Sequence, residues 1–162
     1  MRRIITLERF FDAPLDDVWE LWTTKEGIES WWGPEGFEVR VETLELREGG
    51  ALVYVMTAVA AEQIAAMKQA NLPLSARLTA RYSLVEPKRA VAWQNLADFI
   101  PGVEPYEAAT RVELSQQGDG SVHMRLLIEA MHDEHYTTLA KLGWESELDK
   151  LKQALERRKG TP

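Results

Sequence analysis

The stretch FFDAPLDDVWELWTTKEGIESWWGP, residues 10–34, is the most informative part of the chain. It begins at the end of a strand-like segment, Ile4–Phe11, which is rich in β-branched and aromatic residues. Pro14 then stands where a helix can begin, because the first helical turn does not need the N–H that proline lacks. A second short helix is predicted over residues 25–31 and ends at Gly33-Pro34. The chain therefore opens with a strand followed by two helices.

Alternating apolar and polar residues predict strands along most of the remaining chain. Residues 37–42 alternate cleanly, and the slip at Thr43-Leu44 indicates a bulge. Glu48-Gly49-Gly50 indicates a hairpin into the next strand. The strands predicted from there on cover residues 51–58, 76–84, 90–97, 106–116 and 122–130.

Two further helices are predicted. A short one over residues 62–70 interrupts the strands and is closed by Asn71 and Pro73. A long one over residues 133–158 has an apolar stripe at helical spacing, formed by Trp144, Leu148, Leu151 and Leu155. Since strands and helices do not alternate, the order predicts an α+β fold, an antiparallel sheet with helices on one face. We expect one domain, residues 1–162, because no repeat or linker is present.

Composition excludes several classes of function. With 162 residues the chain suits one domain with a substantial core, and it contains no cysteine, which excludes disulfides and thiolate chemistry. No apolar run reaches the roughly 20 residues of a membrane span, so we expect no membrane partner and a cytoplasmic protein. The net charge is −7 and the basic residues are scattered, which argues against nucleic acid.

Four motifs, in this order and spacing, resemble the heat-shock protein 90 ATPase activator homologue-like family, in the START/Bet v 1 (SRPBCC) helix-grip superfamily. They are the start Phe11-Asp12-Ala13-Pro14 with Val18-Trp19, the element Trp31-Trp32-Gly33-Pro34, the hairpin Glu48-Gly49-Gly50, and Gly143-Trp144 with Leu148 and Leu151. The resemblance covers nearly the whole chain. It implies a curved antiparallel sheet of about six or seven strands wrapped round a long C-terminal helix, with an apolar cavity between them. Residues 62–73 resemble an insertion helix of bacterial members.

The resemblance implies a binding module for a small apolar or aromatic molecule, without a cofactor. Chaperone activation belongs to eukaryotic members with a separate N-terminal domain, and nothing in this chain corresponds to that domain. A chaperone is therefore the least favoured partner, and a homodimer is compatible with the class. Two alternatives stay open: an enzyme acting on a small hydrophobic substrate in the same cavity, and a protein-interaction module.

Aromatic residues, methionines and one glycine are the candidates for the cavity lining. Aromatic side chains can stack on a planar ligand, methionines adapt to irregular shapes, and a glycine leaves room on the helix wall. The predicted lining is Trp32, Phe37, Met56, Met67, Tyr82, Trp93, Phe99, Tyr106, Met124, Leu139, Leu142 and Gly143. Core packing is the alternative for the six tryptophans. It is favoured for Trp19, Trp22 and Trp144, whereas Trp32 and Trp93 suit either role.

A metal site is not expected. His132 and His135 lie three residues apart, but Asp133 between them is better placed to cap the long helix. His135 is the candidate for a catalytic proton shuttle if the chain is an enzyme, although no sequence spacing pairs it with a second group. His123 and Glu129 are expected to point away from the cavity, because they alternate with the apolar residues of their strand.

Overall fold

The computed structural model describes residues 3–98 and 102–159. Its strands are β1 (Ile4–Phe11), β2 (Phe37–Leu44), β3 (Ala51–Ala58), β4 (Ser75–Glu86), β5 (Ala90–Ala97), β6 (Tyr106–Gln116) and β7 (Val122–Glu129). Its helices are α1 (Leu15–Thr23), α2 (Lys25–Glu29), α3 (Ala61–Gln69) and α4 (Glu134–Lys159). The strands pair antiparallel in one sheet of order β1-β7-β6-β5-β4-β3-β2. The predicted α+β helix-grip fold is confirmed.

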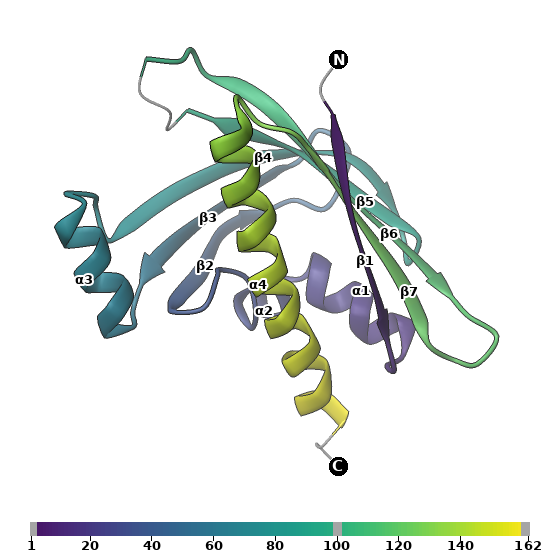
Figure 1. Cartoon of the computed structure of the whole chain (residues 1–162). Coiled ribbons are helices and arrows are strands. Elements are labelled where there is room, and N and C mark those ends of the chain that lie inside the picture. The colour runs from purple at the N-terminus through teal and green to yellow at the C-terminus, as the bar shows by residue number, and fades with distance from the viewer. Residues whose placement is uncertain (1–2, 99–101, 160–162) are drawn as a thin grey trace.

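The sheet curves around α4, which crosses its concave side (Figure 1). The short helices α1 and α2 lie near the C-terminal half of α4, whereas α3 stands apart from it, beyond the ends of β3 and β4 (Figure 1). The sheet, α1 and α2 therefore enclose one half of α4 more completely than the other.

Local sequence explains where the elements begin and end. Pro14 precedes α1, and the Thr24 side chain caps α2 by accepting a hydrogen bond from the Gly27 N–H at 3.0 Å. The predicted cap of α4 is confirmed, since Asp133 Oδ1 accepts the Tyr136 N–H at 3.0 Å. The predicted bulge in β2 is also confirmed, because the register with β3 shifts between Val41 and Thr43.

The core is a layer of tryptophans between the sheet and the helices. Trp22 lies on α1, Trp31 and Trp32 follow α2, Trp93 comes from β5 and Trp144 from α4. Their ring centroids lie 4.6 to 6.5 Å apart in the contacting pairs, at tilted or edge-on angles that aromatic rings favour. Core packing was predicted for Trp22, Trp144 and Trp19. Trp22 is fully buried in the core, and Trp144 and Trp19 are half-buried and pack against it.

Charged residues fix the end of α4 to the start of the chain. Arg158 donates to Asp17 at 3.2 Å and to Glu20 at 2.8 Å, and both acceptors lie on α1. Lys159 donates to Asp12 at 2.6 Å. The cations also suit the negative end of the helix dipole. Within the described ranges, no helix is long and apolar enough to cross a membrane.

Candidate functional site

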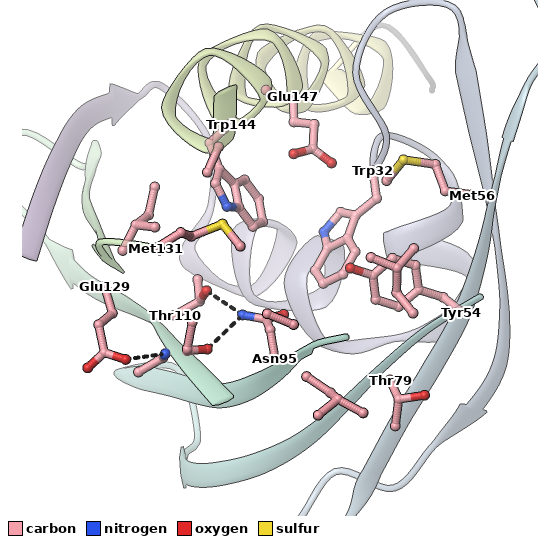
Figure 2. Close-up of a pocket in the computed structure, with 18 of the residues that line it drawn as sticks. Trp32, Tyr54, Met56, Thr79, Asn95, Thr110, Glu129, Met131, Trp144 and Glu147 are labelled. Atoms are coloured by element: carbon pink, nitrogen blue, oxygen red, sulfur yellow. Dashed lines mark hydrogen bonds between the residues drawn. The ribbon is translucent and has the colours of Figure 1, made fainter. Parts of the chain in front are cut away.

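A cavity of about 240 Å³ lies between the sheet and α4 (Figure 2). Its walls come from β3 to β7, from α4 and from the segment that follows α2. Most of the lining side chains are apolar. The residues that line it are Trp32, Pro34, Tyr54, Met56, Leu78, Thr79, Asn95, Leu96, Ala97, Ala108, Ala109, Thr110, Ile128, Glu129, Met131, Ala140, Gly143, Trp144 and Glu147.

The helix wall is one face of α4. Ala140, Gly143, Trp144 and Glu147 follow the three- and four-residue spacing that places side chains on the same side of a helix. A Cβ atom added at Gly143 would meet no other atom within 4 Å. Gly143 therefore leaves open space at the middle of this wall, where a larger side chain would fill the cavity.

The floor of the cavity is held by Asn95 on β5. Its carbonyl oxygen accepts a hydrogen bond from Trp93 Nε1 at 3.0 Å. Its amide group donates to the Ala108 carbonyl oxygen at 3.1 Å and to Thr110 Oγ1 at 2.8 Å, both on β6 (Figure 2). Because both amide hydrogens are used within the protein, Asn95 orients the buried tryptophan and ties β5 to β6 at this point.

Glu147 places a carboxyl group in the cavity wall. The residue is only 8% exposed, and Oε1 accepts the Gly33 N–H at 2.7 Å. Burial raises the pKa of Glu147 to about 7, against the lowering effects of the Gly33 N–H and the Lys150 ammonium. Figure 2 shows the carboxyl group pointing from α4 into the space between Trp32 and Trp144. It is therefore a titratable group inside a largely apolar cavity.

The loop after α2 is attached to α4 by polar side chains. Lys150 Nζ donates to the Gly33 carbonyl oxygen at 2.7 Å and to that of Phe37 at 3.3 Å. Ser146 Oγ accepts the Glu35 N–H at 3.1 Å. Gly33 has a positive φ of 90°, a conformation that glycine adopts without strain. These contacts hold the Trp32 ring against the cavity.

Trp32 and Tyr54 form the wall beside Trp144, whose ring lies edge-on to that of Trp32 with the centroids 5.9 Å apart. Trp32 is 2% exposed, its ring lies edge-on to Tyr54 at 5.2 Å, and its buried Nε1 has no acceptor within the described residues. Burial, followed by the negative charge of Glu147, raises the pKa of Tyr54, so its hydroxyl stays protonated. This wall thus combines aromatic surface with polar hydrogens.

Comparison with known proteins identifies the family. The model of the family described as Activator of Hsp90 ATPase homolog 1-like protein matches residues 12–156. The chain belongs to this family. Among curated proteins, none matches the chain significantly.

Solved structures of similar proteins share the fold. Protein CV1439 from Chromobacterium violaceum is 24% identical, with a TM-score of 0.77 over 94% of this chain and 96% of that chain. The AHSA1 (SPO3351) protein from Silicibacter pomeroyi is 20% identical, with a TM-score of 0.73 over 96% of this chain and 99% of that chain. Protein Ms6760 from Mycobacterium smegmatis is 16% identical, with a TM-score of 0.72 over 96% and 92%. At these identities the likeness concerns the family's fold.

The structure brings only part of the predicted lining together. Trp32, Met56 and Gly143 line the cavity. Three others, Tyr82, Trp93 and Met124, are almost fully buried in the core and do not line it. Contact of Trp32, Met56 or Gly143 with a ligand stays a prediction.

Leu139 and Leu142 lie on the wrong side of α4 for the predicted helix wall. They are 51% and 57% exposed. The helical rotation that directs Gly143 and Glu147 at the sheet turns both leucines towards solvent. The wall is therefore made by Ala140, Gly143, Trp144 and Glu147 and not by these leucines.

The remaining predicted residues lie outside the cavity lining. Phe37 and Met67 are half-buried at other places, Met67 on α3. The Tyr106 hydroxyl accepts the His132 N–H at 2.7 Å instead of facing the cavity. Phe99 lies outside the described residues.

The histidines do not form a site with the cavity. His135 is exposed, edge-on to Tyr136 at 5.3 Å, and is not part of the lining. The His123 ring stacks on the Phe10 ring with the centroids 4.6 Å apart, away from the cavity as predicted.

Glu129 was also expected to point away from the cavity, but it reaches the cavity edge. It lies beyond the last residue pair of β6 and β7, and its carboxylate accepts the Ala109 N–H at 3.2 Å. In the described ranges, no three side chains are grouped to hold a metal ion.

Glu147 and Asn95 are polar site residues that the sequence did not single out. One signal was present for Glu147: it lies three residues after Trp144 and next to Leu148, within the apolar stripe of the helix. A charged residue at such a position is either paired or functional, because a carboxyl group is rarely buried without a reason.

Proposed function

We propose that this chain binds one small, largely apolar ring molecule in the cavity between the sheet and α4. The observation that carries the proposal is the open space at Gly143, in a helix wall that would otherwise be closed by a side chain. Ligand sites are typically concave and mostly apolar, with few polar groups that fix orientation. The cavity has this composition, with Glu147 and the Trp32 N–H among its polar groups.

The size of the cavity limits the ligand. An engineered apolar cavity of roughly 150 Å³ binds benzene. The present cavity, at about 240 Å³, has room for a molecule of about two fused rings. Met56 and Met131 at its edge are adaptable side chains that can follow the outline of such a ligand.

A calorimetric titration with 2-naphthalenemethanol tests the proposal. We expect Gly143→Leu to weaken binding by at least about tenfold, because the new side chain occupies the space of the ligand. Gly143→Ala is the matched control, since one methyl group leaves most of the space open. Both variants are expected to fold, because leucine and alanine are better helix formers than glycine. Equal affinity in wild type and Gly143→Leu would contradict the proposal.

An enzyme is the second candidate function, and Glu147 is the observation that favours it. A carboxyl group with a pKa of about 7 in an apolar cavity is suited to accept or donate a proton near neutral pH. Glu147 therefore replaces His135 as the candidate proton-transfer group. This reading predicts that a compound found bound to the purified protein is converted by the wild type and left unchanged by Glu147→Gln.

A further inference from the structure

The charged residues of the cavity lining are acidic. Among the described residues, the lining contains the carboxyl groups of Glu129 and Glu147 and no lysine, arginine or histidine. Lys150, the cation whose charge acts on Glu147, lies outside the lining, and its ammonium donates to backbone carbonyl oxygens. We propose that the ligand is a cation, a compact ring molecule that carries a protonated amine and is held by the carboxylate of Glu147. This inference rests on the proposed function.

Glu147 has unused capacity to bind such a group. Oε1 accepts the Gly33 N–H, and within residues 3–98 and 102–159 the other oxygen, Oε2, has no hydrogen-bond donor. A buried carboxylate without a full set of partners is costly, and an ammonium group would supply both a donor and the opposite charge. Its charge would also favour the ionised form of Glu147, which burial disfavours.

Two aromatic rings flank the carboxyl group (Figure 2). Trp32 and Trp144 lie on either side of it, and Tyr54 packs against Trp32 (Figure 2). Cations are attracted to the faces of such rings, and tryptophan is the strongest of them. A carboxylate flanked by tryptophans therefore provides two kinds of attraction for an amine in the same place.

The same arrangement disfavours anionic ligands. A fatty acid or an aromatic carboxylate in the cavity would bring a second negative charge beside Glu147, with no cation of the lining to offset it. The net charge of the chain is −7, which adds a general attraction for cations and repulsion for anions.

Four ligands with one ring system test the inference. They are 2-naphthylmethylamine, 2-naphthalenemethanol, 2-methylnaphthalene and 2-naphthoate, titrated calorimetrically at neutral pH and low salt. We expect the amine to bind at least about tenfold more tightly than the alcohol, since a desolvated cation contacts both the carboxylate and the rings. The carboxylate is expected to bind most weakly.

Glu147→Gln should remove the preference for the amine, whereas Glu145→Gln should keep it. Glu145→Gln removes one negative charge from the same helix, outside the cavity. Retained binding of the alcohol by Glu147→Gln shows that the cavity of this variant is intact.

The outcomes separate the two proposals. An amine that binds no more tightly than the alcohol, or whose preference persists in Glu147→Gln, overturns the cation inference while the binding function stands. Failure of all four compounds to bind the wild type overturns the binding function and the inference with it.

Discussion

The two halves of α4 differ in how they meet the sheet. In the C-terminal half, Leu148, Leu151, Ala154 and Leu155 are all buried in the core. In the N-terminal half, the leucines are exposed, and small residues, Ala140 and Gly143, face a cavity instead. One continuous helix thus has a packed half and a hollow half.

We infer that the packed half of α4 stabilises the fold and that the hollow half provides the proposed binding cavity. A cavity forgoes van der Waals contacts and costs stability, so the hollow half weakens the fold unless the packed half compensates. Ser146, Glu147 and Lys150 lie at the boundary and hold the loop that carries Trp32. We infer that the packed half positions this loop while the hollow half stays open.

The largest effect is expected from the packed half. Leu151 is fully buried, so Leu151→Ala should lower the free energy of unfolding by roughly 2–5 kcal/mol through lost burial and a new cavity. Urea denaturation followed by circular dichroism measures this. A loss below 1 kcal/mol would show that this half is not tightly packed.

Glu147 at the boundary should make stability depend on pH. Its pKa is raised from 4.5 to about 7, so the folded state takes up a proton that the unfolded state has lost between these values. The carboxyl group therefore becomes destabilising as pH rises from 4.5 to about 7. Tyr54 and Lys150 face it. Burial and the charge of Glu147 raise the pKa of Tyr54, so Tyr54 does not titrate in this window, whereas burial lowers the pKa of Lys150.

Glu147→Gln removes this dependence. Relative to wild type, the variant should gain about 3 kcal/mol of stability between pH 4.5 and pH 8. Urea denaturation of both proteins at the two pH values measures the gain. A constant difference between the proteins would show that Glu147 does not have a raised pKa.

A smaller effect is expected at Gly143. Gly143→Ala should raise the free energy of unfolding by about 0.5–1 kcal/mol, because alanine is the better helix former and its methyl group meets no neighbour. Thermal denaturation compared with wild type measures it. Destabilisation would mean that the helix lies closer to the sheet at this point.

The smallest effect is expected at the exposed leucines of the hollow half. Leu139→Ala should change stability by less than about 0.5 kcal/mol and leave the binding of 2-naphthalenemethanol unchanged. Loss of binding in this variant would show that Leu139 lines the cavity, as its apolar character predicts from the sequence.

The fold was predictable because its signals are local and repeated. The alternation along β2 and β7, Pro14 before α1 and Asp133 before α4 each indicate one element, and the four family motifs order them. The cavity was less predictable, because much of its lining consists of small residues such as Ala97, Ala108 and Ala140, which carry no distinctive pattern.

The side of α4 that faces the sheet was the second feature that the sequence did not predict. Leu139 and Leu142 are as apolar as Leu148, and only the position of the sheet decides which side of the helix is buried. The tryptophans show the same limit: Trp144 was expected in the core and Trp32 at the site, yet Trp32 is the more buried and both line the cavity. We therefore expect Trp32→Ala to destabilise more than Trp144→Ala.

The most direct test of a hollow and a packed half is methyl NMR of protein labelled with ¹³C at the methionine methyl groups. Met56 and Met131 line the cavity, Met124 is fully buried in the core, and Met67 lies on α3. On addition of 2-naphthalenemethanol, we expect the signals of Met56 and Met131 to shift while those of Met67 and Met124 stay in place. Unchanged signals from Met56 and Met131, or equal shifts at all four methionines, would contradict this expectation.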